Sequence, residues 1–240
     1  MRIDAKGMHF AALNELIRDS ADEEIVIDNV LGQRYIAAGA ADRHIVVRGV
    51  PGNALGAYMN GCLVDVYGSA QDAVGDTMND GVIVVHGSCG DTAGYAMRGG
   101  RIFIEGDAGY RVGIHMKEYG SAVPCIVVGG RAGSYLGEYQ AGGRIVVLGI
   151  GSEGRQCVGD FTSTGMHGGK IYVRGGCIPA DLPRQTEVRA VTDKSELAPL
   201  VRDFCACFGF DADALLADDY FMLVPSTAYI YKTLYVNRPD

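Results

Sequence analysis

The sequence predicts an all-β protein, a single-stranded right-handed parallel β-helix of about seven coils with a 19-residue repeat and short helical N- and C-terminal extensions. Two observations support this prediction. Glycines recur at an almost constant interval of 19 residues, and the residues that precede them alternate with a period of two. The first observation indicates a stacked repeat, and the second indicates that each repeat contributes a strand.

The glycine interval gives the length of one coil. The intervals between glycines that close an apolar run are 19, 19, 19, 24, 19 and 26 residues, at Gly49, Gly68, Gly87, Gly106, Gly130, Gly149 and Gly175. A second series, which we interpret as a structural motif at the corners, is Gly56, Gly75, Gly94, Gly113, Gly137 and Gly159. Corners need positive φ or a close backbone approach, which glycine allows. Units this short bury their apolar faces only against one another.

The residue types before each glycine predict strands. The seven runs have Val or Ile at their second and fourth positions: HIVVR, LVDVY, VIVVH, RIFIE, CIVVG, RIVVL and KIYVR. Alternating β-branched residues are typical of strands with one buried face. Because the same strand recurs once per unit in the same direction, we expect parallel pairing about 4.8 Å apart.

Two further columns indicate which faces are covered. Met59, Met78, Met97 and Met116 stand 19 residues apart, and we interpret them as core rather than as a thioether metal site. The third strand positions should face outwards, yet most are apolar: Val46, Asp65, Val84, Phe103, Val127, Val146 and Tyr172. An apolar outer column predicts a cover from helices of this chain, from another subunit, or from both.

The chain divides into three predicted parts. Residues 1–40 form an N-terminal helix and cap, with Phe10, Leu13 and Ile17 on one helical face. Residues 41–178 form the repeat. Residues 179–240 form a helical C-terminal extension, which ends a helix near Gly209, followed by a tyrosine-rich docking tail.

Composition excludes several classes of function. A net charge of -8 without a basic run argues against nucleic acid as a partner. No stretch approaches the roughly 20 apolar residues that span a bilayer, and the N-terminus lacks a secretory signal, so we expect a cytoplasmic protein. Seven cysteines, an odd number, fit a reducing compartment. The Cys205 and Cys207 pair is a weak metal or redox signal, and we expect no metal in this chain.

Motifs for catalysis are weak or missing. Gly149, Gly151 and Gly154 match GxGxxG, but no helical pattern follows, and Lys170 stands where a dinucleotide site needs an acidic residue. Asp65 and Glu105 alone do not make an acidic cleft. We therefore assign no catalytic and no cofactor-binding residue.

The two longer units carry the interaction candidates. Insertions in solenoids map to loops, often on a binding face. The candidates for contact with a partner are His115, Lys117, Glu118, Glu153 and Arg155. The alternative interpretation is that these are solvated loop residues.

Several segments carry a resemblance to a known family: DNVLGQRYIAAGA, GVPGNALGAYMNG, GIHMKEY, AGGRIVVLG and GMHGGKIYVRG. The chain resembles, over nearly its whole length, the GXGXG β-helix domain at the C-terminus of the glutamate synthase large subunit. It looks most like the stand-alone version of archaea and anaerobic bacteria. Similar domains occur in N-methylglutamate synthase and in a subunit of formylmethanofuran dehydrogenase.

The resemblance implies a structural role. In the family, a glutamine amidotransferase and an FMN and iron-sulfur synthase make glutamate from 2-oxoglutarate, and the β-helix holds them together. The sequence has Arg2, not a cysteine nucleophile, after Met1. The resemblance thus implies a scaffold subunit of a glutamate synthase-like complex, with FMN and the iron-sulfur cluster in its partners. Two alternatives stay open, a self-sufficient β-helix enzyme with a groove site and a subunit of the two related complexes. Homo-oligomers without partners also stay open.

Overall fold

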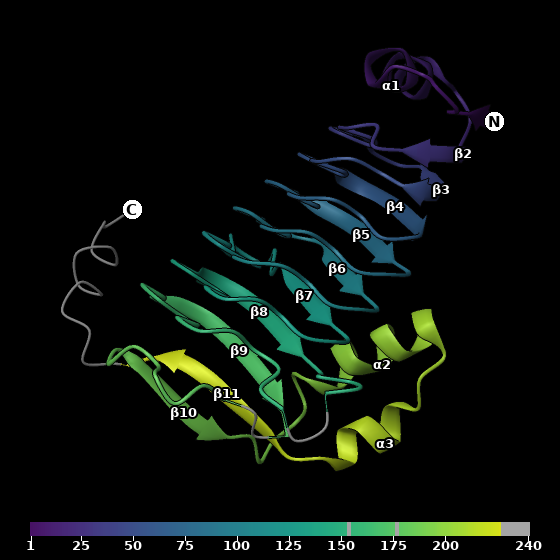
Figure 1. The fold of residues 1–240 in the computed structure, drawn as a ribbon. Helices are drawn as coiled ribbons and strands as arrows, with labels where there is room; N and C mark the ends of the chain where they lie inside the picture. The colour runs from purple at the N-terminus through teal and green to yellow at the C-terminus, as the bar shows by residue number, and fades with distance from the viewer. Residues whose placement is uncertain (153–154, 176–177, 227–240) are drawn as a thin grey trace.

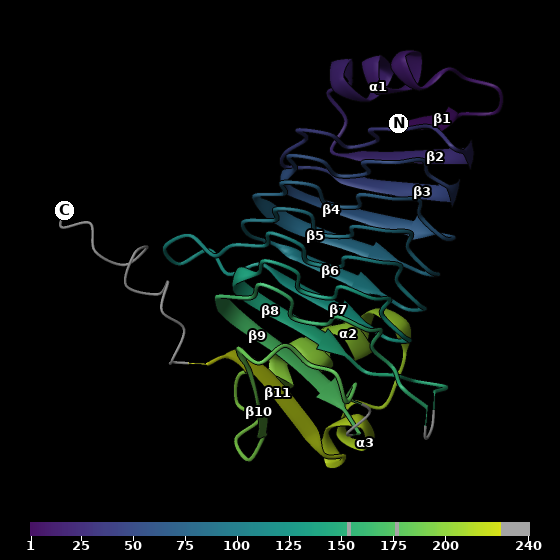
Figure 2. The ribbon, with the colours of Figure 1, turned by 60° about the vertical axis from the view of Figure 1, so that its left-hand side comes forward.

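A computed structural model describes residues 1–152, 155–175 and 178–226, and its strands stack one above another along the molecule (Figures 1 and 2). Within these residues, eleven strands form one sheet in the order β1-β2-β3-β4-β5-β6-β7-β8-β9-β11-β10. The strands are β1 (Arg2–Asp4), β2 (Glu24–Leu31), β3 (His44–Val50), β4 (Asn60–Tyr67), β5 (Asp80–Val85), β6 (Arg101–Ile104), β7 (Cys125–Val128), β8 (Ala141–Val147), β9 (Gly168–Arg174), β10 (Thr186–Ala190) and β11 (Tyr220–Pro225). The helices are α1 (Phe10–Asp19), α2 (Ala198–Phe208) and α3 (Ala212–Ala217).

The seven predicted strand runs are confirmed as β3 to β9. Neighbouring strands pair in parallel, and the Val and Ile positions align with one another, as in Ile45 with Val64 and Val64 with Ile83. These side chains are fully buried. The alternation of β-branched residues therefore sets both the register of the sheet and its core face.

The predicted fold class, an all-β single-stranded right-handed parallel β-helix, is wrong. The structure is a large, mostly parallel mixed sheet with three helices in its described part. The parallel order ends at β9, whose free edge pairs antiparallel with β11, and β11 pairs antiparallel with β10. The repeat stops at Gly175, so the periodicity that predicted the fold contained no signal for the strands that cover this edge.

The turns between strands hold the layers together through their backbone. Ala54, Gly56 and Tyr58 have φ angles of 64°, 68° and 57°, so left-handed residues alternate along the turn. The amides of Ala54 and Tyr58 donate to carbonyls of the following layer, and the amide of Gly56 donates to Ile36 in the preceding layer. The same arrangement recurs in the following layers, so each turn is bonded to both of its neighbours.

The central glycine of each turn is needed for space as well as for its backbone angle. Five glycines of the predicted motif have φ between 65° and 72°: Gly56, Gly75, Gly94, Gly113 and Gly137. A Cβ atom at Gly75 would lie 2.5 Å from Cδ1 of Ile102, and at Gly94 it would overlap Cδ1 of Ile126. The motif glycines therefore leave room for strand isoleucines in the core.

The sixth predicted position, Gly159, lies elsewhere in the turn. Its amide donates to Ala132, and the amide of Gly133 donates to Ala108 in the same way one layer earlier. Ser163, with φ of 64° and an amide that donates to Leu136, stands in place of the motif glycine. The search for glycine at this position selected the wrong residue because the last unit uses serine there.

The methionine column is confirmed as core. Met59, Met78, Met97 and Met116 are fully buried, and Met166 is 1% exposed. Gln140 fills the layer between Met116 and Met166, and its side-chain amide donates to the carbonyls of Gly142 and Gly143 at 3.1 and 3.2 Å.

Helices of this chain cover the apolar outer column, as one of the predicted covers required. Residues of β5 to β9 form a second core with α2: Val84, Phe103, Val127, Val146 and Tyr172 pack with Leu200, Val201, Phe204 and Cys205. Figures 1 and 2 show α2 beside the lower strands of the sheet. Gly209, with φ of 77°, ends α2 as predicted. At the opposite end, α1 buries Leu13 and Ile17 over the first layers.

Ion pairs attach the C-terminal extension to the sheet. Arg101 pairs with Asp203 of α2 at 2.6 Å, and Lys170 pairs with Glu196 at 2.5 Å. The hydrogen bond from Lys170 lowers the pKa of Glu196. Burial, followed by the hydrogen bond to Glu196, raises the pKa of Tyr172, whose hydroxyl donates to this carboxylate at 3.1 Å. Glu196 is therefore the acceptor that joins the start of the extension to β9.

Gly94→Val tests the space under the turn. We expect it to lower the free energy of unfolding by about 3 kcal/mol, from the left-handed backbone and from overlap with Ile126. Gly39→Val is the control, because Gly39 has φ of 65° and an added Cβ meets nothing within 4 Å. Urea unfolding measures both. An equal loss in the two variants would contradict a packing role for Gly94.

Glu196→Gln tests the attachment of the extension. The folded pKa of Glu196 is lowered, so its contribution to stability is present above the unfolded pKa of about 4.3 and is lost as pH falls through the folded value. We expect the variant to lose about 0.5 kcal/mol at pH 7, a small value because the carboxylate is partly exposed. The difference from the unmodified chain should shrink below pH 5. Urea midpoints from pH 7 to pH 4 measure it, and Glu15→Gln is the exposed control. A difference that does not vary with pH would exclude this contribution.

Candidate interaction surface

The turns of the middle and later layers carry an exposed strip of aromatic and charged side chains, which we call the turn strip. It consists of Tyr95, Arg111, His115, Tyr135, Glu138, Tyr139 and Phe161. The strip exists because left-handed turn residues recur at the same places in successive layers, so their side chains stack on one side of the molecule.

His115, a predicted contact residue, lies within this strip. Its ring stacks on Tyr139 with centroids 5.1 Å apart, and Tyr95 meets it edge-on at 6.0 Å. Tyr95 and Tyr139 are 40% and 45% exposed. The His115 amide donates to the carbonyl of Glu138, which fixes the turn below the ring. His115 is thus held between two aromatic neighbours while its outer side faces solvent.

A second row runs beside the first. The Arg111 guanidinium lies 4.7 Å from the centre of the Tyr135 ring, and Tyr135 stacks on Phe161 with centroids 5.0 Å apart. Arg111 also pairs with the nearly buried carboxylate of Glu138 at 3.0 Å. Glu138 joins the two rows, because its side chain holds Arg111 and its carbonyl accepts from His115.

The first insertion folds into a short hairpin next to the strip. Tyr119 and Ala122 exchange backbone hydrogen bonds of 3.0 Å. Glu118, another predicted contact residue, instead anchors the hairpin, since its carboxylate accepts from the Gly143 amide at 3.1 Å. A Cβ at Gly142 would lie 2.5 Å from the Glu118 amide nitrogen, so glycine permits this close approach.

A cavity opens between this hairpin and the stacked turns, and we call it the insert pocket. It has a volume of about 460 Å³ and is lined by Asn79, Arg98, Lys117, Tyr119 and Ala122. Lys117, the third predicted contact residue of this insertion, lies two residues beyond His115. The insert pocket therefore adjoins the turn strip along the chain. In the part of the chain that the structure describes, neither Arg98 nor Lys117 forms an ion pair.

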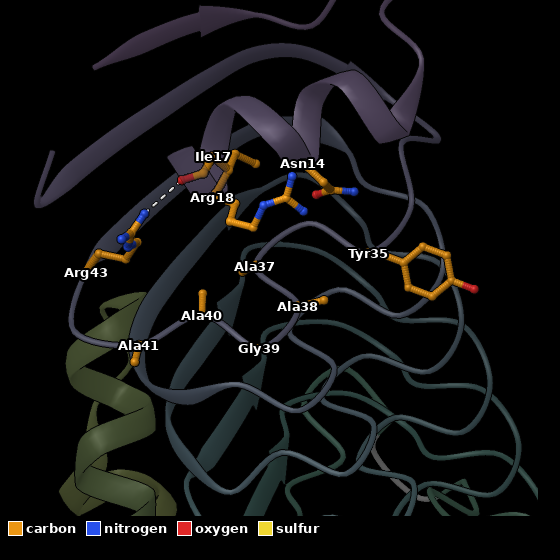
Figure 3. Close-up of a pocket in the computed structure, with 10 residues that line it drawn as sticks. All are labelled: Asn14, Ile17, Arg18, Tyr35, Ala37, Ala38, Gly39, Ala40, Ala41 and Arg43. Carbon is orange, nitrogen blue, oxygen red and sulfur yellow. Dashed lines mark hydrogen bonds between the residues drawn. The ribbon is translucent and has the colours of Figure 1, made fainter. Parts of the chain in front are cut away.

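A second cavity of about 430 Å³ lies below α1, lined by Asn14, Ile17, Arg18, Tyr35, Ala37, Ala38, Gly39, Ala40, Ala41 and Arg43 (Figure 3). Its polar groups are used to attach the helix. Arg43 donates to the carbonyl of Ile17 at 2.8 Å, the bond drawn in Figure 3, and Asn14 donates to the carbonyl of Arg34. Arg18 pairs with Glu15 and Asp19. This cavity is a joint between α1 and the first turn.

The second insertion is not brought together with the first. Glu153 lies outside the described residues. Arg155 closes its own loop, since its guanidinium donates to the carbonyl of Gly151 at 2.9 Å. The loop after β8 projects from the edge where the strands end, and the first insertion projects from the edge where they begin (Figure 2). Of the predicted contact residues, His115, Lys117 and Glu118 therefore share one place and Arg155 another.

The chemistry on offer is recognition by stacking and charge. Among the described residues, no group of three or more His, Cys, Asp or Glu side chains is placed to hold a metal ion. Cys205 is a buried core residue of α2, and burial raises the pKa of its thiol. Burial also raises the pKa of Cys89 to about 12. Within the described ranges, no helix has the length and apolar character needed to cross a bilayer.

Several residues of the surface were missed from the sequence. Asn79, Arg98 and Lys117 each follow a methionine of the core column, so the 19-residue spacing could have revealed a polar column beside it. The aromatic rings of the strip had no constant spacing, because Tyr95 and Tyr139 enter the same stack from different turn positions. Only the folded turn brings them together.

Comparison with known proteins places this surface in a family context. The family described as GXGXG motif matches residues 23–231. The uncharacterized protein MJ1350 of Methanocaldococcus jannaschii is 44% identical over 253 aligned positions, covering 99% of this chain and 96% of its own. A chain of the formyltransferase/hydrolase complex (FhcABCD) of Methylorubrum extorquens, solved with methylofuran, has the same fold, with a TM-score of 0.67 at 21% identity over 94% of this chain and 96% of its own. The chain belongs to the GXGXG motif family.

Proposed function

We propose that this chain is a non-catalytic scaffold subunit of a glutamate synthase-like complex. In this proposal it holds a glutamine amidotransferase subunit and an FMN and iron-sulfur synthase subunit, which together form glutamate from 2-oxoglutarate. The observation that carries the proposal is the match of the GXGXG motif family to residues 23–231. The resemblance of the chain to the glutamate synthase domain gives that match its functional meaning, because this domain joins the catalytic parts there.

The physical character of the molecule supports a role in holding partners. Each layer is bonded to both neighbours through its turns, so the exposed side chains keep fixed relative positions. The helices cover β5 to β9 on the outer face, and the turn strip stays exposed. Tyrosine and arginine are enriched among interface residues that carry binding energy, since they bury large areas and make directed polar contacts.

A second candidate is a subunit of a formyltransferase/hydrolase-like complex. The observation that favours it is the likeness to a chain of the Methylorubrum extorquens complex, which extends over nearly the full length of both chains. The two candidates share a structural role in an assembly and differ in the partners.

Purification of the tagged chain from its native host, with mass spectrometry of the retained proteins and a flavin spectrum, separates these candidates. Retention of a glutamine amidotransferase and an FMN iron-sulfur protein is the expected result. Retention of formyltransferase and hydrolase chains would favour the second candidate. A chain that purifies alone, under conditions that keep known complexes of the host intact, would contradict both.

Tyr139→Ser tests the turn strip as the contact surface. We expect about tenfold less partner to be retained, because removal of a stacked interface aromatic typically costs 1.4 kcal/mol or more. Tyr58→Ser is the matched control, since Tyr58 is 59% exposed and has a left-handed backbone one repeat column earlier in the stack. Quantitative mass spectrometry measures the ratio of partner to tagged chain. Equal retention by the two variants would remove the strip from the interface.

A further inference from the structure

We propose that the insert pocket is a carboxylate-binding site, and that an extended acidic segment of a partner subunit supplies the carboxylate. The identity of that source rests on the scaffold role proposed above, whereas the binding site itself does not. The pocket is separate from the aromatic rows of the turn strip and is distinguished from them by charge.

Three donor side chains stand in register along one side of the pocket. The amides of Asn79, Arg98 and Lys117 donate to the carbonyls of Met59, Met78 and Met97 at 2.9, 2.9 and 3.0 Å. These bonds place the three residues at the same point of consecutive layers, about 4.8 Å apart along the stack. A ligand in the pocket therefore meets a row of an amide, a guanidinium and an ammonium group.

The positive charge of this row is not neutralised by the acidic residues next to it in sequence. Asp80 accepts from the Gly81 amide at 2.7 Å, and Glu118 accepts from the Gly143 amide. The whole chain carries a net charge of -8, so two adjacent cations without an ion pair in the described part stand out. Neighbouring like charges repel each other, and an anion bound between Arg98 and Lys117 removes this cost.

The hairpin of the first insertion supplies the opposite wall. Ala122 lies over Gly99, where a Cβ atom would be 3.4 Å from the Ala122 methyl carbon. Tyr119 places its ring at the rim and is 79% exposed. The wall thus closes the pocket beside Arg98 and leaves its outer side open to solvent.

The donor set identifies the ligand chemistry. A guanidinium binds a carboxylate through two parallel hydrogen bonds, an ammonium adds a point charge, and an amide adds a directed donor. The open rim admits a continuous chain that passes over Tyr119, whereas an enclosed cavity would suit a small molecule. The openness of the pocket therefore favours a carboxylate carried on an extended segment.

Fluorescence polarisation with a fluorescein-labelled tetraglutamate peptide tests the site on the isolated full chain. The variants are Arg98→Met and Lys117→Met, which keep length and remove charge, and Lys6→Met is the control at an exposed lysine far along the chain. We expect each pocket variant to weaken binding about tenfold and the control to leave it unchanged. Binding should also weaken between 50 and 300 mM salt, because charge pairs at the surface are screened.

Free malonate, added as a competitor, separates the two sources of carboxylate. The expected result is competition only at concentrations about a hundredfold above the peptide. Competition at equal concentration would support the site and overturn a partner segment as its ligand. Equal peptide binding by the unmodified chain and both pocket variants, or no binding at low salt, would overturn the site.

The same variants keep this inference distinct from the scaffold role. If partners are retained from the host but the peptide assay fails, the pocket proposal is wrong and the scaffold role stands. If the peptide binds through Arg98 and Lys117 but the chain purifies alone, the scaffold role is wrong and the anion site stands. Circular dichroism and urea unfolding of each variant confirm that it is folded.

Discussion

Backbone hydrogen bonds made by left-handed turn residues are the constraint on which the rest of the structure depends. Alternating left-handed residues turn successive amides towards opposite neighbours, as in Ala54 and Gly56, so every layer is bonded above and below. This bonding continues the ladder of the parallel strands through the turns. The core columns, the outer column and the turn strip all follow from it, because each places equivalent side chains above one another.

The same constraint explains how surfaces with different roles arise on one stack. The outer face of β5 to β9 is apolar and is used inside the chain, where α2 packs on it. The turns are exposed, and there each layer presents a single side chain of any size at a fixed position. Aromatic rings at some layers and cations at others thus make adjacent sites without a change in the backbone.

The sequence predicted much of this arrangement. The Val and Ile alternation gave the seven parallel strands, the methionine spacing gave a core column, and the apolar outer column gave a helical cover. The predicted fold class failed at the chain end, where β10 and β11 make the sheet mixed. Gly159 failed because a 26-residue unit was aligned by residue type, whereas the backbone aligns Ser163.

What the sequence by itself determined is the repeating layer, because periodic apolar and glycine positions are local properties that every unit states again. What only the tertiary structure decided is how distant, non-repeating residues meet. Lys117 and Arg98 lie 19 positions apart, and their approach to Tyr119 depends on the path of an insertion. Glu118 was a contact candidate in sequence and an anchor in space, because the Gly143 amide needs an acceptor. Pairing of β9 with β11 likewise depends on an open strand edge, which no local pattern encodes.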